Sequence, residues 1–141
     1  MAAAWDDIIL ITDEDVKKYE SELTDGLTID IGAVKEHLEI DLHNRFEHTQ
    51  RRCEEYYDDD DFEVLDHIEN PDELKRPAVY FALYFIFSQQ SLGNDNDIYS
   101  QKAKFYLTEY NKALDYACNR LRWDTKITDI VTNQGKVELV W

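Results

Sequence analysis

Apolar residues recur at steps of three or four along most of this chain, which is the spacing of one buried helix face. A short example predicts a helix that starts after Thr12 as N-cap and ends in the turn Asp25-Gly26; its apolar positions are Val16, Tyr19 and Leu23. The longest example predicts one continuous helix after Asp30, with the stripe Ile31, Val34, Leu38, Leu42, Phe46, Thr49, Cys53 and Tyr56.

A third helix is predicted around the most apolar stretch of the chain, Pro77 to Phe87. Asn70 is a suitable N-cap and Pro71 suits the first helical position. Pro77 lies further along, where the missing backbone donor should kink the helix or shift its true start. Nearly every side chain from 78 to 87 is apolar, so we expect this helix to be surrounded on all sides.

A fourth helix is predicted after a polar turn, with Asn96 or Asp97 as its cap. Its stripe is Tyr99, Ala103, Tyr106, Tyr110, Ala113, Ala117 and Leu121. Because the turn is short, the third and fourth helices should pack antiparallel.

The period changes after Trp123-Asp124, where apolar and polar residues begin to alternate. Strands at 127–132 and 136–141 around a loop containing Gly135 are predicted to form a hairpin. The expected fold is therefore mainly α, a compact bundle of about four helices with a C-terminal β-hairpin or extended tail. We expect a single domain over residues 1–141, with the bundle at 12–123 and the hairpin or tail at 124–141.

Two strands alone are marginally stable in water, so the apolar residues of this hairpin need a surface to cover. They either cover their own domain or dock on a neighbouring chain, and both alternatives stay open. If they dock in trans, the partner-binding residues are Ile127, Ile130, Val131, Val137, Leu139, Val140 and Trp141.

Charge is distributed unevenly along the chain. Residues 1–76 hold 24 Asp and Glu against 8 Lys and Arg, whereas residues 77–141 hold 7 against 7, so the net charge of −16 belongs to the first part. Four adjacent acids, Asp58 to Asp61, should end the long helix by mutual repulsion. This balance disfavours specific binding of nucleic acid, because affinity for phosphates comes from Lys and Arg.

The sequence contains no recognisable catalytic or phosphate-binding motif. His37 and Asp41 share a helix face at a metal-ligand spacing, but no Cys or further His pattern supports them, and a solvated face is the favoured interpretation. Cys53 and Cys118 lie on predicted apolar stripes and are expected to be buried thiols. We expect no enzymatic activity, no metal and no cofactor. The run at 77–87 is shorter than the roughly 20 residues that span a bilayer, and no secretion signal is seen at the start, so no membrane association is expected.

Two segments resemble those of a known protein family. They are Ile68-Glu-Asn-Pro-Asp-Glu-Leu-Lys-Arg-Pro-Ala-Val-Tyr-Phe-Ala-Leu-Tyr-Phe-Ile-Phe87 and Asn94-Asp-Asn-Asp-Ile-Tyr-Ser-Gln-Lys-Ala-Lys-Phe-Tyr-Leu-Thr-Glu-Tyr-Asn-Lys-Ala-Leu114. A helix opening with Leu-Lys-Arg, a short acidic turn and a helix with a Tyr/Lys/Ala pattern make the chain similar to head–tail connector (adaptor) proteins of tailed bacteriophages. The likeness covers about residues 66–123. Pro77 and the long first helices depart from the simplest members of that family.

The resemblance implies a virion protein that forms a ring, usually of twelve copies, between portal and tail. Such a ring extends the DNA channel, offers a docking platform for tail components and is assembled in the host cytoplasm. Its implied partners are the portal protein, neighbouring copies of itself and a downstream tail or stopper protein, while DNA passes through without being specifically bound. In that setting Asp58, Asp59, Asp60 and Asp61 would form an acidic channel or inter-subunit loop. The alternative is an acidic DNA mimic that inhibits a DNA-binding enzyme, which explains the charge but not the apolar C-terminal residues.

Overall fold

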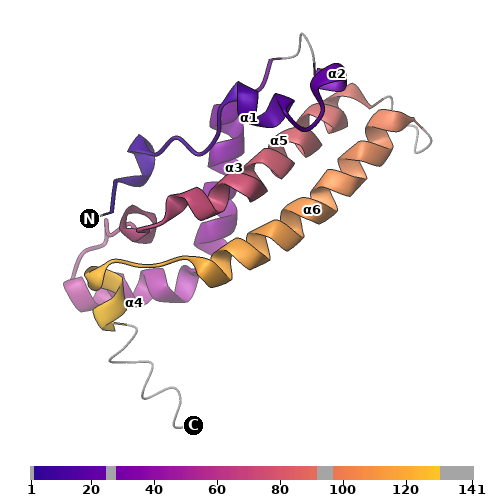
Figure 1. The fold of residues 1–141 in the computed structure, drawn as a ribbon. Helices are drawn as coiled ribbons and strands as arrows, with labels where there is room; N and C mark the ends of the chain where they lie inside the picture. The colour runs from indigo at the N-terminus through magenta and orange to yellow at the C-terminus, as the bar shows by residue number, and fades with distance from the viewer. Residues whose placement is uncertain (1, 25–27, 92–96, 131–141) are drawn as a thin grey trace. The chain divides into compact units, whose positions relative to one another are not determined.

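The structure, a computed structural model, describes residues 2–24, 28–91 and 97–130. Most of these residues are helical (Figure 1). The elements are η1 (Trp5–Asp7), α1 (Asp13–Lys17), α2 (Ser21–Thr24), α3 (Ile31–Arg45), α4 (Glu47–Tyr57), η2 (Val64–His67), η3 (Pro71–Leu74), α5 (Lys75–Gln90) and α6 (Ile98–Arg120). Within the described residues β pairing is limited to an isolated bridge, so the mainly helical fold class is confirmed.

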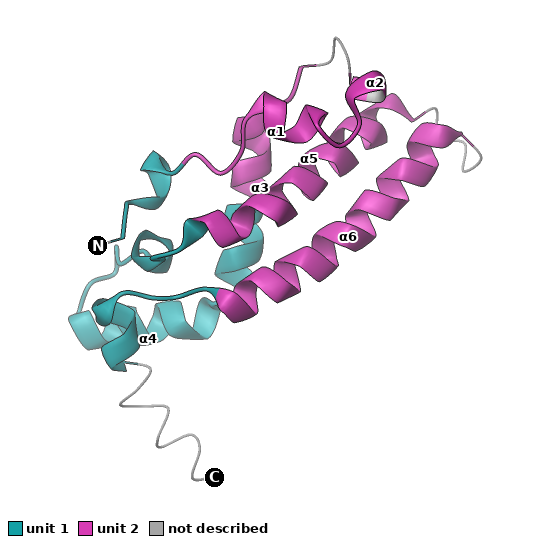
Figure 2. Cartoon of the chain, in the orientation of Figure 1, with its two compact units in different colours: residues 1–8, 38–71, 121–141 teal, residues 9–37, 72–120 magenta. Residues whose placement is uncertain are grey.

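The described residues gather into two compact units, each assembled from separate stretches of the chain (Figure 2). Unit 1 takes its described residues from 1–8, 38–71 and 121–141. Unit 2 takes them from 9–37 and 72–120. Helix α3 starts in unit 2 and ends in unit 1. The single domain expected from the sequence stays a prediction.

Unit 2 is built on an antiparallel pair of helices, α5 and α6, which lie side by side along their lengths (Figure 1). Late residues of α5 meet early residues of α6: the ring of Phe87 lies 6.1 Å from that of Tyr99, centroid to centroid. Early residues of α5 meet later ones, since Phe81 lies 5.2 Å from Tyr110. The predicted antiparallel packing is confirmed.

Helix α5 buries most of its side chains, as its continuous apolar sequence predicts. Pro77, Ala78, Val79, Phe81, Ala82, Leu83, Ile86 and Phe87 are buried. Tyr80, Tyr84 and Phe85 are only half-buried, so the enclosure is not complete on every side. The α-helical hydrogen bonding starts at Lys75 after the 3-10 turn of η3, which places Pro77 in the first helical turn. A missing N–H costs little there, because the first N–H groups of a helix have no partner within it.

Glu20 ties the segment after α1 to α6 within unit 2. Its Oε1 accepts hydrogen bonds from Lys102 Nζ at 2.6 Å and from the Tyr106 hydroxyl at 2.9 Å. The ring of Tyr106 is buried and lies about equally far from Tyr80 and Phe87, with centroid distances of 6.0 and 5.9 Å. The Glu20 carboxylate thus provides the hydrogen-bond partner that the hydroxyl of a buried tyrosine requires.

In unit 1, the long helix predicted from Asp30 to Tyr56 is divided at Phe46 into α3 and α4. Phe46 leaves the helical backbone region with φ −109° and ψ 23°. Its ring packs edge-on against Trp123, with centroids 5.0 Å apart. Leu42 and Cys53 remain buried on either side of the break, so the predicted apolar stripe is correct while the helix is not continuous.

Unit 1 is closed by a short pairing between residues 67–70 and 122–124. Ile68 and Trp123 form an antiparallel bridge, flanked by bonds from the Glu69 N–H to the Arg122 carbonyl and from the Asp124 N–H to the His67 carbonyl. The Asn70 side-chain oxygen also accepts a bond from the Arg122 N–H at 2.7 Å. Asn70, predicted as a helix cap, therefore helps to join two distant parts of the chain.

The predicted C-terminal strand is wrong over the residues that the structure describes. Residues 125–130 are helical, and Ile127 and Ile130 are 0% and 1% exposed. The Asp124 carboxylate accepts the Lys126 N–H at 3.0 Å, and its carbonyl accepts those of Ile127 and Thr128, as at a helix start. Ile127 and Ile130 are three residues apart, a spacing that places both on one helix face but on opposite faces of a strand. The second predicted strand and the hairpin loop lie outside the described residues.

The burial of Ile127 predicts that this residue stabilises its own chain. Ile127→Ala should lower the free energy of unfolding by about 2–5 kcal/mol, because it removes buried methyl groups and leaves a cavity. Urea unfolding of the purified protein measures the change, with the exposed neighbour Asp129→Ala as control. An unchanged stability of the Ile127 variant would mean that the side chain serves an external partner instead.

The raised pKa of Tyr106 predicts that the folded protein loses stability in alkali. Burial, together with the bond to the Glu20 carboxylate, raises the pKa of Tyr106. Above the ordinary tyrosine pKa of about 10 the unfolded chain releases this proton while the folded chain keeps it, so the free energy of unfolding should fall as pH rises. Tyr106→Phe should make that fall shallower in urea titrations at several pH values, whereas the exposed Tyr116→Phe should not. Equal slopes in the Tyr106 variant and the parent would contradict the assignment.

Candidate functional site: a cation-lined cavity in unit 2

A cavity of about 550 Å³ opens on unit 2. It lies among α1 with the turn after it, η3, the first turns of α5 and the last turns of α6. Its lining consists of Asp15, Lys18, Tyr19, Asp72, Glu73, Lys75, Arg76, Pro77, Val79, Ala113, Tyr116 and Arg120. We call this the unit 2 cavity.

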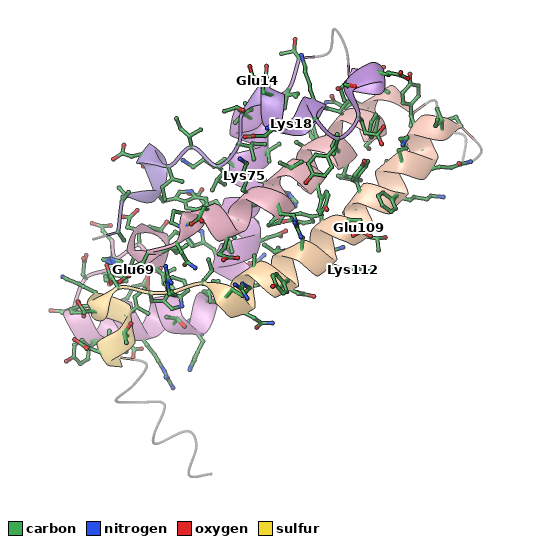
Figure 3. The ribbon with its side chains drawn as sticks, viewed as in Figure 1. Glu14, Lys18, Glu69, Lys75, Glu109 and Lys112 are labelled. Carbon is green, nitrogen blue, oxygen red and sulfur yellow. The ribbon has the colours of Figure 1, made fainter. Side chains whose placement is uncertain are left out.

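The first wall of the cavity is held in place by a capping box at the start of α1. The Thr12 N–H and hydroxyl both donate to the Asp15 carboxylate, at 2.9 and 3.1 Å, while the Asp15 N–H donates back to the hydroxyl. Asp15 also pairs with Lys75 at the start of α5, with Nζ 3.1 Å from Oδ1. This ion pair joins α1 to α5, and Figure 3 labels Lys18, the C-cap of α1, and Lys75 on α5.

The opposite wall comes from the end of α6. The Arg120 guanidinium lies 3.4 Å from the Glu73 carboxylate of η3 and 5.2 Å from the centroid of the Tyr116 ring. The Tyr116 side chain is exposed. The Arg120 guanidinium is thus held between a carboxylate and an aromatic face.

Cations are concentrated in this cavity. Its lining contains Lys18, Lys75, Arg76 and Arg120, which are four of the fifteen Lys and Arg residues of a chain with net charge −16. Two of them are paired with Asp15 and Glu73, as described. Among the residues that the structure describes, Lys18 and Arg76 form no ion pair. The cavity thus has two exposed positive groups that are not neutralised by a fixed partner.

The Asp15 carboxylate is held in its charged form. The hydrogen bond from the Thr12 backbone lowers the pKa of Asp15, partial burial opposes this, and Lys75 lowers the pKa further. The wall of the cavity therefore stays ionised at neutral pH. The arrangement suits the binding of an anionic group with aromatic neighbours. The lining contains no His, Cys or Ser that could act as a nucleophile or proton carrier.

The acidic loop predicted from the sequence is exposed. Asp58 forms the C-cap of α4 with a left-handed backbone, φ 50°, and Asp58 to Asp61 are all exposed. The Asp59 carboxylate accepts the Asp61 N–H at 3.0 Å, which makes a compact turn. The predicted end of the helix at these acids is confirmed, and their functional role stays a prediction.

The predicted partner-binding residues fall into two groups. Ile127 and Ile130 are buried within unit 1, in the helical residues 125–130. Val131, Val137, Leu139, Val140 and Trp141 lie outside the described residues.

The His37 ring and the Cys53 thiol, which could carry chemistry elsewhere, are packed against or among other side chains. His37 stacks on Phe81, with ring centroids 3.8 Å apart. Over residues 2–24, 28–91 and 97–130 there is no cluster of three His, Cys, Asp or Glu side chains placed to hold a metal ion. Cys53 is fully buried, and burial followed by the nearby Asp124 charge raises the pKa of its thiol, which disfavours the reactive thiolate.

Sequence reasoning did not find the unit 2 cavity. Its signal was present in Lys75-Arg76, two adjacent cations at the start of the most apolar helix, just after an acidic stretch. The other two cations come from positions 18 and 120, and only the folded chain brings them to the same cavity.

Comparison with known proteins adds no relative: no family model, curated protein or solved structure matches this chain. A search of the described helices finds none with the length and apolar character needed to cross a lipid bilayer.

The capping box predicts how the α1 wall responds to acid. Since the pKa of Asp15 is lowered by folding, its stabilising effect is complete above the unfolded-state pKa and is lost as pH falls through the folded value. Asp15→Asn should cost about 0.5–1 kcal/mol at neutral pH, because it weakens the capping box and the ion pair with Lys75, and should reduce the loss of stability in acid. Urea unfolding from neutral to acidic pH measures both effects. Asp13→Asn, in the same helical turn but exposed, is the control, and an equal effect of the two substitutions would contradict the role of Asp15.

Proposed function

We propose that this chain is a structural virion protein, a head–tail connector that forms a ring between the portal and the tail of a bacteriophage. The ring, a dodecamer, extends the DNA channel and presents a platform for the next tail component. This role requires no catalysis and no cofactor, and its location is the virion neck.

The observation that carries this proposal is the antiparallel pair α5–α6. It is formed by the same residues that resemble connector proteins, from the Leu-Lys-Arg opening to the Tyr/Lys/Ala helix. Their aromatic contacts make the pair a well-packed core for unit 2. A ring subunit needs such a core, because each copy must keep its shape while it contacts two neighbours.

Exposed side chains supply two further arguments. Ile98 and Phe105, on α6, are 52% and 54% exposed, and large apolar side chains of this kind are suited to subunit contacts. The exposed acids Asp58 to Asp61 would repel DNA from a channel wall or contact a neighbouring subunit.

The C-terminal residues 131–141 keep their proposed role as contacts with the portal or a neighbouring copy. Ile127 and Ile130 are withdrawn from this role because they belong to the core of unit 1. A deletion that tests docking should therefore begin after Ile130, so that the buried isoleucines and the helical residues 125–130 are retained.

Electron microscopy of virions tests the proposal. In particles of the phage that encodes this chain, negative-stain images should show a ring of density below the portal. Particles made with the gene interrupted should lack that ring and carry no tail, and expression of the intact chain in trans should restore both. A chain ending at Ile130 should fold, as judged by circular dichroism, and fail to restore the ring.

An unchanged neck in the particles without this protein would overturn the connector role. Affinity capture from infected cells then distinguishes the remaining alternative: salt-sensitive recovery of a basic DNA-binding enzyme would favour the DNA mimic, because such a contact relies on screened charge.

A further inference from the structure

The unit 2 cavity has an excess of cations in a strongly acidic protein. Lys18 and Arg76 are exposed and without an ion pair among the described residues, whereas the cavity acids Asp15 and Glu73 are already paired. Asp72 is the remaining acid of the lining. The lining therefore carries four positive and three negative groups, so a negatively charged occupant would meet a net positive charge there.

The volume of the cavity and the tyrosines at its edge indicate which class of molecule could bind there. A cavity of about 550 Å³ has room for several side chains, and pockets of about 300–1,000 Å³ are typical of ligand sites. Tyr19 and Tyr116 are 47% and 59% exposed at its edge, and such rings give contact area at low entropic cost. A short acidic peptide segment with an aromatic residue suits these features.

This chain contains such a segment. The end of α4 and the turn after it read Glu54-Glu-Tyr-Tyr-Asp-Asp-Asp-Asp-Phe62. Asp58 to Asp61 are all exposed, and Tyr56 is 59% exposed. The left-handed backbone at Asp58 and the bond from the Asp61 N–H to Asp59 hold the four acids in a compact turn. A preformed turn loses less entropy on binding than a freely moving segment.

We propose that the acidic turn Asp58–Asp61 of one copy binds in the unit 2 cavity of the next copy. The contact pairs its carboxylates with Lys18 and Arg76, and Lys75 lies in the lining of the same cavity. It is a heterologous contact, since the two copies use different surfaces, and repetition of such a contact generates a ring when the rotation closes. The inference rests on the proposed ring and names the contact that joins its subunits.

Zero-length cross-linking with a carbodiimide tests the contact, because this reagent joins a lysine amine to a carboxylate only when the two touch. A mixture of ¹⁴N- and ¹⁵N-labelled full-length protein is treated at high protein concentration and low salt. Mass spectrometry should then identify mixed-isotope peptides that join Lys18 or Lys75 to the segment 54–62. Their yield should fall sharply in about 1 M salt, where the Debye length is about 3 Å.

Matched variants decide whether the cavity is responsible. In the double variant Lys18→Glu, Arg76→Glu, Lys75 is the remaining cavity lysine that the reagent can link. The mixed-isotope link at Lys75 should nevertheless be abolished, because the altered cavity no longer attracts the acidic turn. Lys104→Glu with Lys112→Glu makes the same charge change at exposed α6 positions outside the cavity, and should leave the link intact (Figure 3 labels Lys112). Absence of the link in the parent protein, or its equal loss in both pairs of variants, would overturn the proposal.

Reversing the charges of the turn as well as those of the cavity distinguishes a lost contact from a misfolded variant. Asp59→Lys with Asp60→Lys should also abolish the link, because the altered turn then faces a positive cavity. Mixing this turn variant with the cavity variant should restore association, as each altered surface meets a complementary one, and sedimentation velocity should show larger species in the mixture than in either variant alone. A mixture that stays as small as its components would overturn the pairing of these two surfaces.

The connector role and this contact fail in different ways. A normal ring below the portal in particles carrying the cavity variant would reject the contact and leave the connector role intact. Mixed-isotope links in the purified protein, combined with an unchanged neck in particles that lack it, would reject the connector role and leave the contact.

Discussion

The segment from Pro77 to Phe87 has to be removed from water, and the arrangement of unit 2 follows from this requirement. An apolar helix needs partners around it, and α6 supplies one side with aromatic rings while α1 supplies another. Each fully buried Leu or Phe contributes roughly 1.5–3 kcal/mol, so the buried side chains of this helix contribute several kcal/mol to the unit. The polar contacts at its margin, such as Glu20 with Tyr106, satisfy groups that the packing brings inside.

The same requirement explains where charge can collect. The first turn of α5 emerges from the apolar core at Lys75 and Arg76, which must stay exposed. Helix α6 runs antiparallel and ends at Arg120, so its last cation arrives at the same end of the pair. Asp15 is drawn to Lys75 and fixes α1 alongside. A cluster of cations thus results from the direction of two helices, although the chain as a whole is acidic.

Sequence patterns predicted the parts of the fold that depend on neighbouring residues. The Thr12 cap, the α5–α6 pair and the helix end at Asp58 all have local signals. The break at Phe46 depends on Trp123, far along the chain, and could not be seen in a helical period. The helical residues 125–130 were missed because the β-branched residues of 127–132 favoured a strand, although two isoleucines three apart share a face only in a helix. The unit 2 cavity could not be predicted from the local signal at Lys75-Arg76, since three separate segments of the chain, 15–19, 72–79 and 113–120, line it.

The interleaving of the two units has a consequence for how the chain folds. Unit 1 needs the Trp5 N–H on the Asp66 carboxylate and the bridge between Ile68 and Trp123, which join residues 61 and 55 positions apart. Unit 2 contains the hairpin of α5 and α6, whose contacts are mostly closer in sequence. Loop closure makes distant contacts slower to form. The α5–α6 hairpin is therefore expected to form before the pairings that close unit 1.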